Sequence, residues 1–347
     1  MKPRQIFISI LAVLFVFPLT GMFAQQAPNS ISINVITTFE YPGTVISTQP
    51  QKINDGGDIV GTYIDSLGAT RGFVRFSNGN FSPPIVEPND TENFTQGRGI
   101  NNLGIVCGDY AGSDDNGHGF FLSRGTFTEY NVPNALATLV FGINEVGDFV
   151  GTFSDGNGIF QAFVNLGGAV TPFTVPGASS TFAYQINNSN RLVVGYYVDS
   201  SGILHGYFRD PNRTLHFPID PSGSTGTVLF GLNERNWVVG RYSDSSGVTH
   251  GFFLVPPNKF FTFDYPGSTF TSLNGINTHG FICGRYTDAS RIDHGFLARV
   301  TGVLPANEAG TEMNAYDFPS LITPHHAPSM VTPVNRSPSP RRGEPAS

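Results

Sequence analysis

The chain has 347 residues, 41 of them Gly and 31 Phe, and a formal net charge of −7 at pH 7. This charge is mild and no basic stripe runs along the chain, so nucleic acid is excluded as an expected partner. Short Val, Ile, Phe, Tyr and Thr runs bounded by Gly, Asn, Asp and Ser recur without a sustained helical period, and they predict an all-β protein.

The first element that we expect is a secretory signal peptide over residues 1–24. Lys2 and Arg4 precede an apolar run over residues 6–19, and Ala24 supplies a small residue for cleavage. The run is shorter than the roughly 20 residues that span a bilayer. We therefore expect a secreted or periplasmic protein with no transmembrane span after signal cleavage.

The rest of the chain repeats one phrase six times. Each copy contains an Asn after Ile or Leu, then two apolar residues, a Gly, a variable residue and an aromatic residue, as in Ile59-Val60-Gly61-Thr62-Tyr63. Eleven residues after this Gly comes a second Gly or an Ala, followed by Phe or Tyr. The repeated Asn residues are spaced by 47, 43, 43, 46 and 44 positions: Asn54, Asn101, Asn144, Asn187, Asn233 and Asn277.

A period near 45 residues that holds four strand-sized runs is typical of a β-propeller blade. We predict a six-bladed β-propeller of four-stranded antiparallel blades over residues 31–302. Residues 38–44 nearly repeat residues 262–268 although no repeat precedes them, so an N-terminal strand is expected to complete the last blade and close the ring. Residues 316–320 are a rival for this strand. The Pro/Ser/Arg-rich extension over residues 303–347 is expected to be mostly disordered.

The third strand of each repeat carries a His-Gly-Phe phrase or a variant of it. The copies are His118-Gly119-Phe120, Gln161-Ala162-Phe163, His205-Gly206-Tyr207, His250-Gly251-Phe252 and His294-Gly295-Phe296, with Arg71 in the His position of the first repeat. Over residues of about 36 to 300 the chain resembles the bacterial "probable extracellular repeat, HAF family", although Gly replaces the Ala of the family phrase. The resemblance implies export and a repeat architecture, and it implies no particular activity.

An Asp stands six residues before the His, Arg or Gln of most repeats. Because Arg cannot bind a metal whereas His, Arg and Gln all donate hydrogen bonds, we interpret the column as structural donor–acceptor pairs and not as a metal or acid–base site. Repeat 2 has Gly112 at this position, and its donor is His118. The other pairs are Asp65 with Arg71, Asp155 with Gln161, Asp199 with His205, Asp244 with His250, and Asp288 with His294.

Cofactors are not indicated by the sequence, and calcium is the one ion that the turns could hold. Residues 113–117 (Ser-Asp-Asp-Asn-Gly) are the best calcium candidate, although an Asx turn explains them equally simply. Cys107 and Cys283 occupy a Val column in blades that are not neighbours, so we expect both to be free and buried.

The variable residue after the repeat Gly is the binding candidate. Its identities include Asp109, Tyr196, Arg241 and Arg285, and a purely structural position would not change chemistry in this way. These side chains would form an asymmetric polar ring if they reach the propeller axis, whereas pairing between blades would make them structural.

Three functions remain open. The leading hypothesis is a monomeric exported scaffold that binds a glycan or a protein, and Trp237, the single Trp, is an additional candidate for stacking on a sugar. The first alternative is an enzyme that processes polysaccharide or peptide at the axis, which we favour less because no catalytic motif is present. The second alternative is a structural component of the cell envelope.

Overall fold

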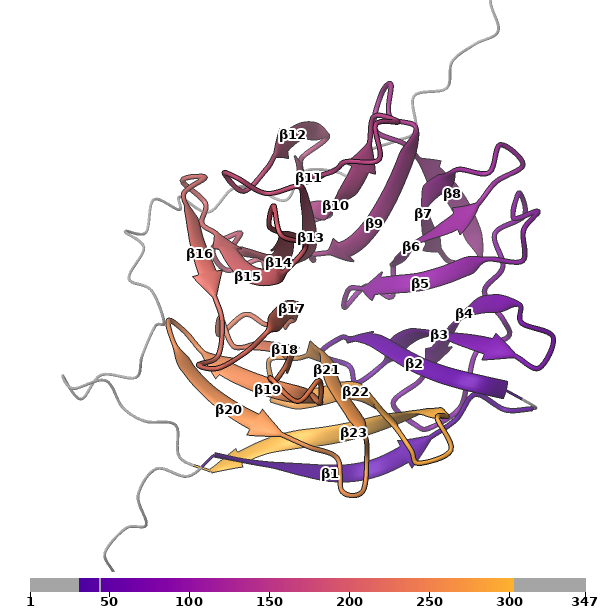
Figure 1. The fold of residues 1–347 in the computed structure, drawn as a ribbon. Coiled ribbons are helices and arrows are strands. Elements are labelled where there is room, and N and C mark those ends of the chain that lie inside the picture. Colours follow the sequence, from indigo (N-terminus) through magenta and orange to yellow (C-terminus); the bar gives the residue numbers. More distant parts are fainter. Residues whose placement is uncertain (1–30, 44, 303–347) are drawn as a thin grey trace, which may run out of the picture.

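The computed structural model describes residues 31–43 and 45–302, which form 23 β-strands and no helix. The strands are grouped radially around a common centre (Figure 1). The predicted signal peptide, the C-terminal extension and the rival strand at residues 316–320 lie outside the described residues. Within the described part, no helix is long and apolar enough to cross a membrane.

Repeats 2 to 4 each form a separate four-stranded antiparallel sheet, as predicted. We call the sheets blades and number them by repeat. The strands of blades 2 to 4 are β5 (Thr95–Ile100), β6 (Val106–Ala111), β7 (Gly117–Ser123), β8 (Thr126–Tyr130), β9 (Ala137–Ile143), β10 (Phe149–Ser154), β11 (Phe160–Leu166), β12 (Ala169–Phe173), β13 (Ser180–Ile186), β14 (Val193–Val198), β15 (Leu204–Arg209) and β16 (Leu215–Ile219).

Blades 5, 6 and 1 are linked into one larger sheet by single parallel residue pairs, Thr249 with Phe270 and Ser47 with Asp293. The strands of blades 5 and 6 are β17 (Gly226–Leu232), β18 (Val238–Ser243), β19 (Thr249–Val255), β20 (Lys259–Phe263), β21 (Phe270–Ile276), β22 (Phe281–Thr287) and β23 (Asp293–Gly302).

Blade 1 departs from the predicted four strands. It contains β2 (Val45–Ile53), β3 (Ile59–Asp65) and β4 (Thr70–Arg75). In place of a regular outer strand, Phe81 pairs with Arg75 and Ile85 pairs with Gly72 as isolated bridges. The longer first repeat thus inserts an irregular loop where the other blades have a strand.

The fourth strand of blade 6 comes from the N-terminal side of the chain. β1 (Ile31–Phe39) pairs antiparallel with β23, from Ile31 opposite Gly302 to Phe39 opposite Gly295, and Figure 1 shows the two strands side by side. This confirms the predicted pairing of an N-terminal strand with the last repeat. β2 of blade 1 also packs against β21, β22 and β23, so the first and last repeats are in contact.

Phe39 at the end of β1 provides a test of this arrangement. Its ring lies 6.1 Å from the ring of Phe81 and beneath the guanidinium of Arg75, 4.7 Å away. Since this half-buried ring joins blades 6 and 1, Phe39→Ala is expected to lower the free energy of unfolding by about 1–2 kcal/mol. Ile36 of the same strand is 52% exposed, and Ile36→Ala should change it by less than about 0.5 kcal/mol. Equal effects in urea unfolding would contradict the arrangement.

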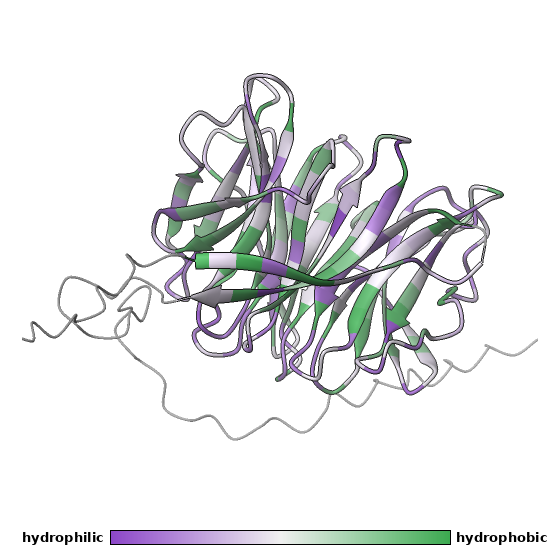
Figure 2. Cartoon of the chain, turned by 90° about the horizontal axis from the view of Figure 1, so that it is seen from below, coloured by the Kyte–Doolittle hydropathy of each residue, from purple (hydrophilic) through white to green (hydrophobic). Residues whose placement is uncertain are grey.

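The repeated Gly and aromatic columns form the core of each blade. The ring on the third strand is fully buried in every blade and lies against the Gly of the second strand, as Phe163 does against Gly151. A Cβ at Gly151 would collide with that ring and with the carbonyl oxygen of Leu139. Hydrophobic and hydrophilic residues alternate along many strands (Figure 2), as expected when successive side chains lie on opposite faces of a sheet. The sequence phrase is therefore a packing requirement.

Candidate functional site

The Asp–His pairs lie on the outer part of the blades. The Nε2 atoms of His205, His250 and His294 lie 3.5, 3.5 and 3.4 Å from the carboxylates of Asp199, Asp244 and Asp288, respectively. In blade 1, Arg71 Nε lies 3.6 Å from Asp65. These Asp residues also cap their own turns. Hydrogen bonds from backbone N–H groups, that of Ile203 above all, hold the pKa of Asp199 below its usual range.

Each of these His side chains has a second and shorter acidic contact that sequence reasoning missed. The Nδ1 atoms lie 2.7 Å from Asp220, 2.8 Å from Asp264 and 2.7 Å from Glu40, for His205, His250 and His294 in turn. The second carboxylate follows the fourth strand of the blade. The signal was present, because Glu40 and Asp264 occupy equivalent places in the two similar N-terminal and blade 5 phrases.

Two repeats depart from the predicted pairing. In blade 3 no hydrogen bond joins the described side chains of Asp155 and Gln161, and Asp155 instead accepts the N–H of Asn157. The predicted pair of Asp155 and Gln161 is therefore not formed between these described side chains. In blade 2 the partner of His118 is Asp114, 2.9 Å from Nε2. The four described His of the column all stack on a Tyr of the second strand, with centroids 5.0–5.3 Å apart.

The calcium candidate loop is held by its own hydrogen bonds. Asp114 accepts the N–H of Asn116 and its side-chain amide, in addition to His118. In the described part of the chain, no group of three or more His, Cys, Asp or Glu side chains is placed to hold a metal ion. Both cysteines are free and fully buried, and burial raises the pKa of each thiol to about 12.

The axis is the second place where repeated residues meet. Each repeated Asn donates a hydrogen bond from its side-chain amide to the backbone carbonyl of the next repeated Asn, and Asn277 donates to Asn54. The six donor–acceptor distances are 3.2, 3.1, 3.4, 3.3, 2.9 and 3.0 Å, in chain order from Asn54. The hydrogen bonds therefore form a complete cycle, which we call the Asn cycle.

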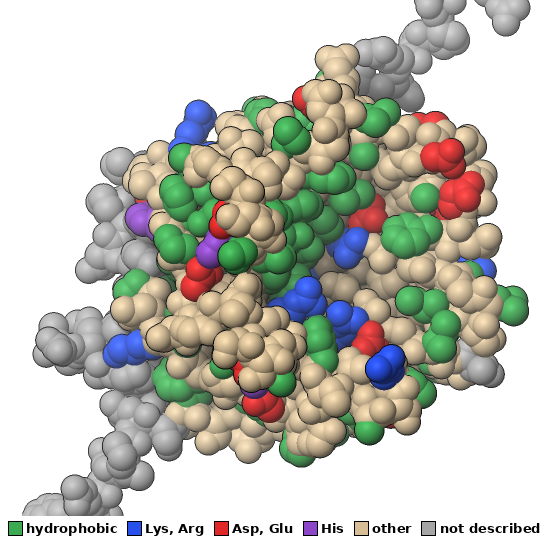
Figure 3. Space-filling model, in the orientation of Figure 1, with side chains coloured by type: hydrophobic (Ala, Val, Ile, Leu, Met, Phe, Trp, Pro, Cys, Tyr) green, Lys and Arg blue, Asp and Glu red, His purple; other side chains and the backbone are tan. Residues whose placement is uncertain are grey.

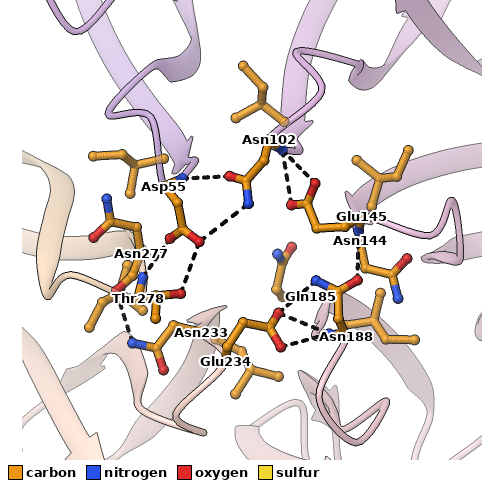
Figure 4. Close-up of a pocket in the computed structure, with 16 residues that line it drawn as sticks. Asp55, Asn102, Asn144, Glu145, Gln185, Asn188, Asn233, Glu234, Asn277 and Thr278 are labelled. Carbon is orange, nitrogen blue, oxygen red and sulfur yellow. Dashed lines mark hydrogen bonds between the residues drawn. The ribbon is translucent and has the colours of Figure 1, made fainter. Parts of the chain in front are cut away.

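The residues that follow the Asn cycle form a second polar ring (Figure 4). Asp55, Glu145 and Glu234 alternate around it with Asn102, Asn188 and Thr278. Hydrogen bonds join neighbouring members from Thr278 through Asp55 to Glu234, as where the backbone N–H of Asn102 donates to Glu145 at 2.9 and 3.0 Å. The ring encloses a pocket of about 50 Å³ with an aliphatic floor, room for a few water molecules. This end of the axis is narrow.

A β-bulge at one position of every inner strand sends a side chain toward the axis. Strand pairing slips by one residue three positions before each repeated Asn, which leaves one residue unpaired in each blade. The bulge residues are Gln51, Arg98, Phe141, Tyr184, Phe230 and Asn274. Sequence reasoning missed this column, although the same alignment contains it.

Three of the four predicted binding residues, Asp109, Tyr196 and Arg241, contact bulge residues. Asp109 forms a 2.8 Å ion pair with Arg98, and the ring of Tyr196 lies 5.7 Å from that of Tyr184. The guanidinium of Arg241 lies over the Phe230 ring at 5.3 Å. Arg285 forms a 2.6 Å ion pair with Asp293 of its own blade. Asp109 and Tyr196 contact bulge residues of their own blades, so they are not simple salt bridges between blades.

These side chains line a hollow at the wide end of the axis. The repeats follow one another anticlockwise in Figure 1 and clockwise in Figure 4, so the two figures view the axis from opposite ends. Figure 3 has the orientation of Figure 1 and therefore shows the end opposite the Asn cycle. The face is hollowed at its centre, with hydrophobic side chains along one side and Lys and Arg along the other (Figure 3). Tyr184, Tyr196, Arg241 and Arg285 are partly exposed, and each contacts an aromatic ring of an inner strand. We call this region the axial hollow.

One side of the axial hollow is an aromatic wall contributed by blades 3, 4 and 5. Phe141 stacks on Tyr184 with centroids 4.5 Å apart, and Phe230 meets Tyr184 edge-on at 5.0 Å. Phe182 stacks on Tyr196 at 4.6 Å. Burial raises the pKa of both tyrosines, so their hydroxyls remain neutral hydrogen-bonding groups.

Lys52 crosses the axis and was not predicted as a site residue. It follows the bulge of blade 1, is only 4% exposed, and places its Nζ over the Tyr184 ring of blade 4 at 5.6 Å. Its hydrogen bond is to the carbonyl oxygen of Asn274, at 3.5 Å. Trp237, the proposed sugar-stacking residue, lies away from the hollow and packs edge-on against Phe253.

Comparison with known proteins supports the fold only. No known family profile and no curated protein matches the chain. Among solved structures, a TolB-like protein from Agrobacterium tumefaciens has a TM-score of 0.52 at 13% identity over 79% of this chain and 99% of its own. AofleA from Arthrobotrys oligospora has a TM-score of 0.51 at 11% identity over 80% and 91%. A six-bladed propeller lectin from Aleuria aurantia, described with a fucose recognition mode, has a TM-score of 0.46 at 13% identity over 76% and 97%.

Proposed function

We propose that this chain is an exported six-bladed β-propeller that closes into a ring and binds an extracellular glycan in the axial hollow. Export rests on the signal-peptide pattern of residues 1–24 and on the resemblance to the HAF repeats. The chain would act alone, as a monomeric binding scaffold in the periplasm or outside the cell.

Three observations support ring closure. The Asn cycle includes the bond from Asn277 of the last repeat to Asn54 of the first. β1 supplies the outer strand of blade 6. Tyr41, just after β1, stacks on Tyr63 of blade 1 at 3.9 Å, as Tyr265 after β20 stacks on Tyr286 of blade 6 at 3.6 Å. β1 therefore relates to its neighbours as the other outer strands do.

One observation supports the binding function: the six repeats differ in chemical character at the positions beside the axis. The Asn, Gly and core aromatic positions repeat in all six blades, because they hold the blades together. The bulge and second-strand positions beside the axis carry acidic, basic, aromatic and amide side chains. Packing between repeats does not require such changes of chemistry beside the axis, whereas a ligand without sixfold symmetry does.

An aromatic wall beside polar groups suits a saccharide. Sugar rings present apolar C–H faces to aromatic rings and hydroxyls to polar side chains. The ring of Tyr196 is partly exposed, and the guanidinium groups of Arg241 and Arg285 provide polar groups, so both kinds of contact are present in the axial hollow.

The enzyme alternative has weaker support. The carboxylates of the axial hollow, Asp109 and Asp293, form ion pairs of 2.8 and 2.6 Å with Arg98 and Arg285. A general acid or base at either position would first have to leave its guanidinium partner. The envelope-component alternative finds no particular observation in its favour.

A glycan array probed with the purified full chain tests the proposed function. We expect retention on a subset of saccharides, and Tyr196→Ala should weaken it at least tenfold by removing a stacking face. Phe217, a 38% exposed ring on the outer strand of blade 4, provides the control, and Phe217→Ala should bind normally. No retention, or retention that survives Tyr196→Ala, would overturn the assignment of the hollow as a glycan site.

A further inference from the structure

The axial hollow carries more positive than negative side chains. Blades 1, 2, 5 and 6 contribute four cations, whereas two carboxylates lie among them. The cations are Lys52, Arg98, Arg241 and Arg285, and the carboxylates are Asp109 and Asp293. The axial hollow is therefore positively charged, although the net charge of the whole chain is −7.

Pairing inside the hollow leaves two of the cations without a carboxylate. Arg98 is paired with Asp109 and Arg285 with Asp293. Arg241 has neither a carboxylate nor a hydrogen-bond acceptor among the described residues, and its guanidinium lies between Phe230 and Phe270, 5.3 and 5.4 Å from their centroids. Burial, together with the charge of Arg285, lowers the pKa of Arg241.

Lys52 is the second uncompensated cation. Its ammonium has one backbone carbonyl at 3.5 Å and an aromatic face, although an ammonium can donate three hydrogen bonds. Both cations lie against the aromatic wall, since Lys52 lies over Tyr184 and Arg241 lies over Phe230, which meets Tyr184 edge-on. Two unneutralised cations beside one aromatic cluster are costly unless an anion arrives with the ligand.

We propose that the axial hollow selects acidic saccharides, whose carboxylate or sulfate group is held by Lys52 and Arg241 while the sugar ring lies against the aromatic wall. This inference rests on the proposed function of the hollow as a glycan site. The planar guanidinium suits an oxyanion with two oxygens in one plane, and the ammonium adds a point charge. Sialic acids, uronic acids and sulfated sugars share the chemistry required.

The ordinary explanation of Arg241 is cation–π packing. Such packing occurs elsewhere in this protein, as where Arg299 lies over Phe281 at 5.0 Å. Arg299 is exposed to solvent, so its charge needs no counter-ion. Arg241 is partly buried and stands next to a second guanidinium, so packing alone leaves repulsion that an anionic ligand would relieve.

Matched pairs of saccharides separate this inference from the proposed function. The full chain is applied to an array that carries uronic acids beside their methyl esters and sulfated sugars beside their unsulfated forms. We expect each bound acidic sugar to exceed its neutral counterpart at least tenfold in affinity, with the difference shrinking as salt is raised. The carboxylate and sulfate arms show which group is preferred. Neutral forms that bind as tightly would overturn the inference and leave the glycan site standing, whereas binding of neither form would overturn both.

Substitution of Arg241 places the effect in the hollow. Arg241→Gln should weaken the preferred acidic sugar at least tenfold in calorimetry and leave its neutral counterpart nearly unchanged. Arg299→Gln is the control, because it removes an Arg that lies on an aromatic ring outside the hollow. An equal loss for acidic and neutral sugars in Arg241→Gln would show a packing role and overturn the charge assignment. Circular dichroism confirms that both variants fold.

Discussion

Asn277→Ala is expected to lower the free energy of unfolding by about 3 kcal/mol. The side chain is 3% exposed and makes three hydrogen bonds. Its oxygen accepts the N–H groups of His279 and Phe281 at 3.1 and 3.0 Å, and its amide donates to the carbonyl of Asn54 at 3.0 Å. Alanine leaves two backbone donors without partners at the narrow end of the axis, where little water enters, and it removes the link to Asn54, whose carbonyl keeps only the N–H of Gly57.

Asn101→Ala is the matched control for this variant. Asn101 is 1% exposed and makes the same three bonds, at 3.1, 3.0 and 3.1 Å, but its amide links blades 2 and 3, which are neighbours in the chain. If the blades close into a ring, the two substitutions remove equivalent contacts and should lower stability equally in urea unfolding. A much milder effect of Asn277→Ala would contradict closure between the last and first repeats.

The repeat architecture could be read from the sequence because its key residues solve the same steric problem in every blade. Gly151 faces Phe163 and the carbonyl of Leu139, and no side chain fits there. The repeated Asn closes its own turn and reaches the next blade, which no other residue type does as well. Residues that play the same local role in every blade recur at a regular spacing, and this spacing allows the repeats to be aligned with one another.

The axial hollow could be predicted only in part, because one extra residue in each inner strand decides its lining. A bulge changes the direction of the side chains that follow it, and an alternating pattern does not reveal where the bulge lies. Arg98 and Tyr184 therefore do not follow from the pattern, whereas Asp109 and Tyr196, on regular strands, can be predicted to lie on one strand face. Lys52 does not follow from the repeat pattern, because most repeats have Gly at its position.

Contacts between residues that are distant in the sequence could not be predicted either. His294 bonds to Glu40, 254 residues away, through the N-terminal strand. The turn Asp was predicted as the His partner because it is near in sequence, whereas the shorter contact depends on which strand lies beside which. Trp237 was considered for sugar stacking because of its residue type alone, and type says nothing about location.

Lys52→Met is expected to stabilise the protein by roughly 3 kcal/mol at pH 7. Burial lowers the pKa of Lys52 to about 8. At neutral pH the folded state therefore contains a buried charged ammonium, which costs more free energy than a neutral group would. Arg98, which also faces it, adds repulsion. Methionine has similar length and fills the same space with apolar atoms. Lys259→Met, in the partly exposed β20, should change stability by less than about 0.5 kcal/mol.

The gain should depend on pH in a defined direction. The folded pKa of Lys52, about 8, lies below the ordinary value of 10.5, so between these values the unfolded chain binds more protons and the wild type gains stability as pH rises. The difference between Lys52→Met and the wild type should be constant below pH 8 and vanish near pH 10.5. Comparing the two proteins cancels the titration of tyrosines and other shared groups. A difference that does not change with pH would show that the ammonium is not desolvated.

The same variant separates stability from binding. If Lys52 served only the fold, natural sequence variation would have every reason to replace it, because an apolar residue at this position is more stable. A bound anion would neutralise the buried charge of Lys52. The free energy of binding would then offset the loss of folding stability that this charge causes. Lys52→Met should therefore melt at a higher temperature and bind an acidic saccharide at least tenfold more weakly. A variant that is more stable and still binds with full affinity would show that the charge has no part in recognition.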